Sequence, residues 1–265
     1  MDKDFSLITF NCCQIDLGKL LKGGFSTGHG FLREPNSIRS AASLACISIQ
    51  SNQNDMFGGQ SINAWDWCLA PYVTKSFKHH FKRNAKFLAD SLDEKILSEE
   101  WDEILSNPNL HYAENSADQE GPFSIQAKSE KAFSNQNRNK LLNKAWKQAC
   151  ADTEDETKQA MEAAIHNFNS LHSRAGGQVP FSSINYGLCT SPEGRLVIRM
   201  TLEAIWDGLG HGETPIFPIS VFQLKASVNY NPGDPNYDLF ERACEVSAKR
   251  LFPKQNWGLS GCIAA

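Results

Sequence analysis

The sequence has no strong excess of either charge, no long apolar run and no secretory start. Its 265 residues carry 26 Lys and Arg against 30 Asp and Glu, a formal net charge of -4. Proteins that bind nucleic acid through its phosphates usually cluster positive charge, so this balance argues against general DNA or RNA binding. The apolar stretches fall well short of the roughly 20 residues that cross a bilayer, and the first residues lack a basic and apolar signal segment. We therefore expect a cytoplasmic protein that binds neither nucleic acid nor membranes.

The eight cysteines have no paired spacing. A structural zinc site usually brings its ligands in C-x-x-C pairs, and no such pair occurs here. In a reducing compartment the thiols should stay free, and most should pack as small hydrophobic side chains. No H-E-x-x-H or similar histidine pattern is present either, so we expect no bound metal.

The composition and patterning predict a globular α/β protein. Hydrophobic residues make up 41% and charged residues 21% of the chain, which is typical of a folded domain. Strand patterns alternate with helix patterns, as in parallel or mixed sheets. We expect strands over 5–10, 179–186 and 214–224. We expect helices over 37–54 and 64–90, and further helices that begin at Thr153-Glu154-Asp155-Glu156 (a capping box), Ser191-Pro192 and Asp234-Pro235, the last ending near Arg250.

Two regions read as irregular. Residues 18–36 are rich in glycine and are expected to form a loop. Residues 107–140 are rich in Asn, Ser and Gln, with weak patterning, and are expected to form a loop or a surface insertion.

Asn11-Cys12-Cys13 directly follows the first expected strand. The junction between a strand and a loop is where α/β and barrel folds place reactive groups. A thiol there is a candidate nucleophile, metal ligand or redox group. Packing of both cysteines in the core is the alternative, and the pair alone does not decide between them.

Two short segments are candidate phosphate sites. Asn36-Ser37-Ile38 opens a predicted helix, whose first amides are free to bind an anion, and Gly58-Gly59-Gln60-Ser61 is a glycine-containing turn. Neither matches a Walker or Rossmann pattern. Ordinary caps and turns explain them equally well.

An ordered set of segments resembles the anaerobic (class III) ribonucleotide reductases. Phe10-Asn11-Cys12-Cys13-Gln14-Ile15-Asp16-Leu17 is similar to the segment that carries one of that family's two active-site cysteines. The similarity covers about residues 5–254 and is weakest over 85–150. Its further segments are Gly24-Phe25, Glu34-Pro35-Asn36-Ser37-Ile38, Gly58-Gly59-Gln60-Ser61-Ile62, Leu69-Ala70-Pro71, Leu171-His172-Ser173, Gln178-Val179-Pro180-Phe181, Thr190-Ser191-Pro192-Glu193, Phe217-Pro218, Gly233-Asp234-Pro235-Asn236-Tyr237-Asp238 and Ala248-Lys249-Arg250.

This resemblance implies reduction of ribonucleoside triphosphates to deoxyribonucleotides in a ten-stranded α/β barrel made of two five-stranded halves. In the family, an activating enzyme that uses S-adenosylmethionine and an iron–sulfur cluster generates a glycyl radical, which oxidises one barrel cysteine to a thiyl. Cys12 matches the second cysteine, which supplies reduction at C2′, with formate in most members. Cys13 occupies a variable neighbouring position. The segments near the nucleotide correspond to Asn36, Ser37, Gly58, Gly59 and Gln60.

The resemblance also implies partners. The helix over 37–54 matches one at the family's dimer interface, where deoxynucleotide specificity effectors bind, so a homodimer is expected. ATP is a further effector of the family. One face of this helix is rich in small residues that would allow close approach: Ser40, Ala41, Ser43, Ser48 and Ser51.

Some family features have no counterpart in the sequence. These are the glycyl radical loop, the four-cysteine zinc site near it and the segment bearing the thiyl cysteine. We expect residues 1–254 to form one domain, the N-terminal part of the barrel, followed by a divergent tail over 255–265. The chain is then a reductase fragment, inactive alone, that needs a complementing C-terminal half. The alternatives are a catalytically inactive remnant that only binds nucleotides or dimerises, and a relative of pyruvate formate-lyase, against which the NCCQID and EPNSI segments argue.

Overall fold

The computed structural model describes residues 12–28, 30–53, 58–91, 98–123, 131–172 and 179–257. The strand expected over 5–10 lies outside these ranges.

A five-stranded sheet forms the base of the fold, in the order β1-β4-β5-β6-β7. All four strand pairs are parallel, which confirms the α/β class. The strands are β1 (Cys13–Gln14), β4 (Gln60–Ile62), β5 (Ser182–Tyr186), β6 (Ile219–Leu224) and β7 (Lys254–Trp257). A separate antiparallel hairpin pairs β2 (Phe25–Ser26) with β3 (Phe31–Leu32).

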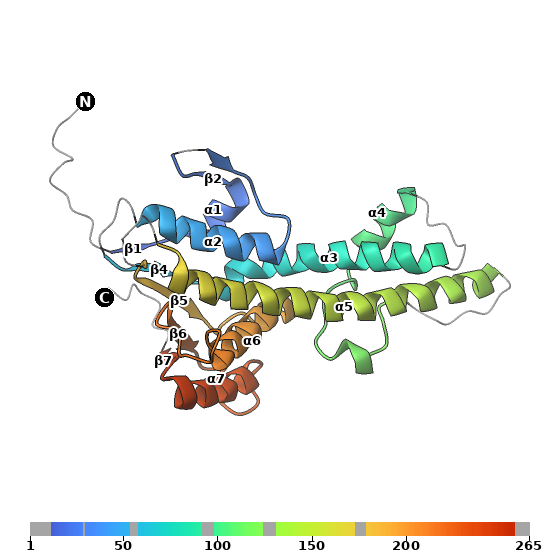
Figure 1. The fold of residues 1–265 in the computed structure, drawn as a ribbon. Helices are drawn as coiled ribbons and strands as arrows, with labels where there is room; N and C mark the ends of the chain where they lie inside the picture. Colours follow the sequence, from blue (N-terminus) through green and yellow to red (C-terminus); the bar gives the residue numbers. More distant parts are fainter. Residues whose placement is uncertain are drawn as a thin grey trace.

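The helices gather on one side of the sheet (Figure 1). They are α1 (Leu17–Gly23), α2 (Ile38–Asn52), α3 (Trp65–Ser91), α4 (Ser98–Ser106), α5 (Lys131–Ser170), α6 (Pro192–Asp207) and α7 (Tyr237–Arg250), with a short 3-10 turn, η2 (Ser116–Asp118). Helices α3 and α5 lie side by side and extend beyond the sheet as a two-helix arm (Figure 1).

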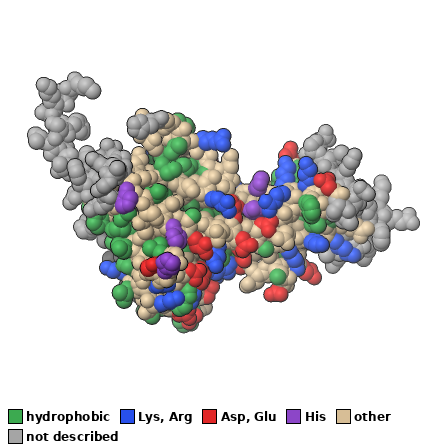
Figure 2. Space-filling model, viewed as in Figure 1, with side chains coloured by type: hydrophobic (Ala, Val, Ile, Leu, Met, Phe, Trp, Pro, Cys, Tyr) green, Lys and Arg blue, Asp and Glu red, His purple; other side chains and the backbone are tan. Residues whose placement is uncertain are grey.

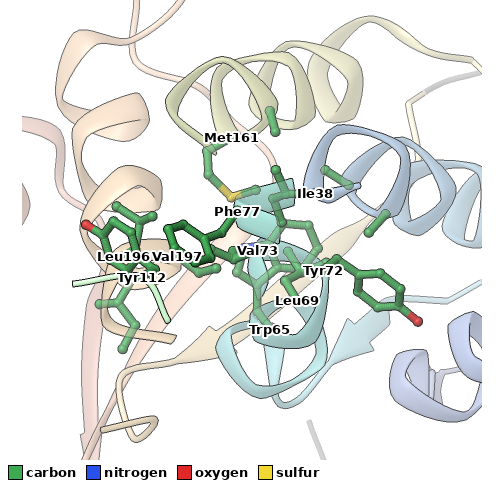
Figure 3. Packing of buried hydrophobic residues seen from close by; sticks show 14 of the residues in the cluster. Ile38, Trp65, Leu69, Tyr72, Val73, Phe77, Tyr112, Met161, Leu196 and Val197 are labelled. Atoms are coloured by element: carbon green, nitrogen blue, oxygen red, sulfur yellow. The ribbon is translucent and has the colours of Figure 1, made fainter. Parts of the chain in front are cut away.

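A stripe of apolar side chains on α3 forms the centre of the core. Its residues recur every fourth position, so successive members lie on neighbouring turns and the stripe winds slowly around the helix. Figure 3 shows Phe77 beside Met161 of α5 and Val197 of α6. All of the stripe is buried, and it comprises Trp65, Leu69, Val73, Phe77, Phe81, Ala85 and Ala89. Burying one such large side chain stabilises the fold by about 1.5–3 kcal/mol.

Three helices were predicted close to their observed bounds. Helix α2 begins after Ser37, whose side chain accepts a hydrogen bond from the Ser40 amide. Helix α3 matches the prediction over 64–90 and contains Pro71 in its second turn. Helix α6 begins at Pro192 with Ser191 as its N-cap, as predicted.

The predicted helix start at Thr153 is wrong. Thr153 lies in the middle of α5, which begins at Lys131. Its hydroxyl donates to the Ala149 carbonyl one turn earlier, at 2.6 Å, instead of capping a free amide. No glycine or proline interrupts Lys131–Ser170, so the helix continues through a segment that merely matches a capping box.

The predicted start of α7 at Asp234 is also wrong. Asn236 is the N-cap, and the Asp234 carboxylate instead accepts from the amides of Tyr230 and Asn231.

The two regions expected to be irregular contain structure. Residues 18–36 include most of α1 and the hairpin of β2 and β3. Part of 107–140 belongs to α5, and its connecting segment buries Leu110 and Tyr112 instead of lying on the surface. Strand β7 also includes residues of the expected divergent tail, because it pairs with β6 from Lys254 onward.

Asp66 clamps the loop that follows β5. Its side chain is only 1% exposed, and burial raises the pKa of its carboxyl. One carboxylate oxygen accepts from three consecutive amides, those of Gly187, Leu188 and Cys189, at 2.9–3.0 Å. The side-chain amide of Asn236 donates to the carbonyls of Gly187 and Cys189 in the same loop. The loop therefore has its backbone groups satisfied from α3 and from the start of α7.

We predict that Asp66→Ala lowers the free energy of unfolding by about 3 kcal/mol or more, because it leaves three amides without their acceptor and each costs about 1–3 kcal/mol. Urea unfolding measures this effect. The matched control is Asp90→Ala, at an exposed aspartate on the same helix, which should change stability by less than about 0.5 kcal/mol. Equal losses of unfolding free energy in the two variants would show that Asp66 does not hold the loop after β5.

Candidate functional site

The two faces of the sheet differ in what covers them. Along β5, Ser182, Ile184 and Tyr186 are buried while Ser183 and Asn185 are half-exposed. Side chains alternate along a strand, so the first set lies against the helices and the second set lies on the other face. We call these the covered face and the open face.

The strand register extends both faces across the sheet. Gln14 pairs with Ser61, Ser61 with Ser183, and Ser183 with Ile219. In a parallel sheet, residues in register share a face. The open face therefore includes Gln14, Ser61, Ser183, Asn185, Ile219, Val221 and Gln223.

Strand alternation assigns the two adjacent cysteines to different faces. Cys13 pairs in register with Gln60, which is 1% exposed on the covered face. Asn52 of α2 donates to the Cys13 Sγ at 2.9 Å, and burial raises the pKa of the Cys13 thiol. Cys12 is exposed, and alternation directs it to the side of Gln14 and the open face.

A small polar network lies at the end of β4. The Asn63 side-chain oxygen accepts from the Asn185 amide at 2.9 Å and from the Ser61 hydroxyl at 3.3 Å. Ligands of open parallel sheets bind at the carboxyl ends of the strands, where this network lies. The sequence reasoning did not single out Ser183 or Asn185. The polar residues alternating with buried ones in Ser182–Tyr186 were the signal that could have identified them.

The structure places Gly59 and Gln60 beside Cys13, and Gly58 directly precedes them in the chain. The Gly59 carbonyl accepts from the Cys13 amide at 3.1 Å. The Gln60 side chain lies on the covered face, where it accepts from Asn52 and donates to Gln53, each at 2.8 Å. Of these three residues, Gly59 is thus the one whose backbone bonds to the residue directly after Cys12.

Asn36 and Ser37 lie at the opposite end of α2. The helix has 15 residues, which corresponds to about 22 Å. A single ribose cannot span this distance. The residues predicted to bind nucleotide therefore form two separate groups, one near Cys12 and one at the start of α2.

The second group lines a groove between α2, α3 and α5. The groove has a volume of about 670 Å³, and its lining includes Asn36, Ser37, Arg39, His80, Asp152 and Glu156. On the face shown in Figure 2, basic, acidic and histidine side chains lie together over α3 and α5.

His80 lies between two carboxylates in this groove. Its Nε2 is 2.8 Å from Glu156, and its Nδ1 is 4.0 Å from Asp152 and has no hydrogen-bond partner. The hydrogen bond from His80 lowers the pKa of the Glu156 carboxyl. The groove thus combines both signs of charge with hydrogen-bonding groups.

Three other cysteines are buried and belong to the core. Burial raises the pKa of Cys46 to about 12 and that of Cys150 to about 11, and it also raises the pKa of Cys189. A thiol with a raised pKa forms little of the reactive thiolate at neutral pH. These cysteines therefore fit the expected packing role.

The described ranges contain no group of three or more His, Cys, Asp or Glu side chains arranged to hold a metal ion. No helix in those ranges is long and apolar enough to cross a membrane.

Comparison with known proteins identifies the family. The family model described as anaerobic ribonucleoside-triphosphate reductase matches residues 1–259. Curated relatives with the same name are 31% identical in Escherichia coli and 30% identical in Haemophilus influenzae, each over 92% of this chain. The relative from Enterobacteria phage T4 is 26% identical over 95% of the chain.

The chain spans only part of these relatives. It covers 27% of the length of the two bacterial proteins and 34% of the length of the phage protein. The match reaches past the expected boundary at residue 254 and includes all of β7. By its family match and its relatives, the chain belongs to the anaerobic ribonucleoside-triphosphate reductases, an oxidoreductase family, and represents part of such an enzyme.

Proposed function

We propose that this chain forms the half of the reductase barrel that carries Cys12, and that its open face becomes the wall of the active site. The remaining strands of a ten-stranded barrel would face the open side, supplied by the rest of the reductase. The complete enzyme would reduce ribonucleoside triphosphates in the cytoplasm.

One observation carries this proposal. Of the two adjacent cysteines, the one that matches the family's second active-site cysteine is also the one that alternation directs to the open face. Cys13 lies on the covered face with its Sγ bonded to Asn52. Polar side chains that suit a nucleotide, Ser61 and Asn185, lie on the same open face.

In the complete enzyme, a glycyl radical outside this chain would supply the radical chemistry at the ribose. The role of this chain would be to place a thiol next to the 2′ carbon of the sugar. There the Cys12 thiol would protonate the departing 2′ hydroxyl, so that the C2′–O bond breaks and water leaves. The resulting Cys12 thiolate would give one electron to the sugar radical and become a thiyl, which formate or a second thiol would reduce.

The two groups of predicted binding residues receive different roles in this proposal. Gly58 and Gly59 let the nucleotide approach the start of β1 closely, since neither has a side chain. Gln60 supports the strand from the covered face. Asn36 and Ser37 line the groove at the start of α2, where a deoxynucleotide or ATP effector would bind.

The test is reconstitution with a complementing C-terminal half and the radical-generating activase. In this system Cys12→Ser should lower ribonucleotide reduction at least about 1,000-fold, because serine keeps the size but cannot supply the redox equivalent. Cys13→Ser is the matched control and should keep most of the activity. The measurement is deoxyribonucleotide formed per enzyme.

Two outcomes would contradict the proposal. Equal losses in the two variants would remove the assignment of Cys12. A wild-type chain that binds the second half and nucleotide without any turnover would indicate a non-catalytic remnant.

The proposal includes a homodimer formed through α2. The structure changes which residues of this helix can contact a partner: Ala41 and Ser48 are buried in the chain's own core, whereas Ser40 and Ser43 are exposed. Ser51 is half-exposed at the end of the helix. In this proposal Ser40 and Ser43, the two fully exposed small residues, make the close helix approach across a two-fold axis.

We predict that the double variant Ser40→Arg, Ser43→Arg converts the dimer to a monomer, because it places four charges in a symmetric interface. Light scattering measures the mass. The control is Lys78→Ala on the exposed side of α3, which should leave the dimer intact. A dimer that survives the double substitution has its interface elsewhere, and a wild-type monomer excludes the dimer.

A further inference from the structure

Cys12 and Cys13 are adjacent at the start of β1 and carry the same thiol group. The fold must therefore direct one thiol to each face of the sheet. Strand β1 has two residues and lies at the edge of the sheet. Its described backbone bonds to β4 include those from the Cys13 amide to Gly59 and from the Ile15 amide to Ser61. So short an edge strand has little pairing of its own to hold its orientation.

The last residue of α2 contacts this strand from the covered side. The side-chain amide of Asn52 donates hydrogen bonds to the Cys13 Sγ, at 2.9 Å, and to the Gln60 Oε1, at 2.8 Å. Cys13 and Gln60 are register partners on neighbouring strands. Asn52 therefore bridges β1 and β4 by their side chains, in addition to the backbone bonds.

The bridge continues into α2 and its C-cap. Gln60, which is almost fully buried, donates to the Gln53 side chain at 2.8 Å. The backbone amide of Gln53 donates to the Ile49 carbonyl, so Gln53 belongs to the end of the helix. The three side chains thus tie the start of β1 to the end of α2.

We propose that Asn52 is a positioning residue: by holding the Cys13 thiol on the covered face, it directs Cys12 to the open face. Ile15, two residues beyond Cys13, is partly buried against the core and opposes a one-residue slip that would exchange the two thiols. Ile15 sets the register, and Asn52 holds the inward thiol within it. The importance of this orientation for turnover rests on the proposed role of Cys12.

The test measures which thiol reacts, and it needs no turnover. The folded 265-residue chain is treated briefly with iodoacetamide and digested with trypsin. The modified position within the peptide over 4–19 is then located by mass spectrometry. In the wild type, Cys12 should react at least about tenfold faster than Cys13, since Cys12 is exposed and Cys13 is held inward.

Two variants remove the bridge in different ways. Asn52→Leu keeps a similar volume without any donor, and Asn52→Asp keeps the shape but cannot donate to the Cys13 Sγ. In both, we expect the Cys12-to-Cys13 rate ratio to fall about fivefold to tenfold, the value of one lost hydrogen bond. The matched control is Asn84→Leu, at a half-buried asparagine on α3 that bonds to Asp152, and its ratio should stay within about twofold of the wild type.

Three results would overturn the inference. They are equal reactivity of the two thiols in the wild type, an unchanged ratio in both folded Asn52 variants, and loss of the folded circular dichroism signal in both. The last would make Asn52 a residue of general stability instead of one that orients a thiol. If the ratios change as expected but Cys12→Ser retains activity in the reconstituted enzyme, the orientation by Asn52 stands and the proposed function fails.

Discussion

The pairing of β1 with β4 is the interaction on which the candidate site depends. Parallel register places Cys13 opposite Gln60 and Gln14 opposite Ser61, and the period of two along each strand then assigns every neighbouring side chain to a face. From that one register follow the exposed thiol of Cys12, the inward thiol of Cys13 and the polar side chains that share the open face. A change of one residue would exchange them all.

The helices on the covered face keep this register in place. The apolar stripe of α3 packs against α5 and α6, and it fills the layer behind the sheet with large buried side chains. Polar contacts act at the margins of that layer. Asp66 fixes the loop that follows the central strand β5, and Asn52 contacts the edge strand β1. Apolar packing thus stabilises the helical layer, and a few buried polar groups fix the positions of the loop after β5 and of strand β1.

Part of this arrangement could be read from the sequence. The bounds of α2, α3 and α6 followed from apolar spacing and N-caps, which are local signals. The start of α5 did not, because the segment at Thr153 has the residues of a capping box while the helix simply continues through it. The buried connection around Tyr112 was missed for a similar reason. Its polar neighbours suggest a loop, and only tertiary contacts bury it.

The candidate site shows the same division between local and long-range information. A family resemblance indicated Cys12 and the segments near it. The predicted helix over 37–54 already separates Asn36 and Ser37 from the residues around Gly59. The sequence could not show that Gln60 lies on the covered face, because that depends on the strand register, which involves residues more than a hundred positions apart, such as Gln60 and Ser182.

The central claim is that the open face is covered by the rest of the reductase. Hydroxyl-radical footprinting of the chain with and without a complementing C-terminal half tests it directly. Phe181, which is 47% exposed just before β5, and Ile219 of the open face should become protected, while Phe87, which is 72% exposed on α3, should not change. Protection of Phe87 with no change at Phe181 and Ile219 would contradict the account.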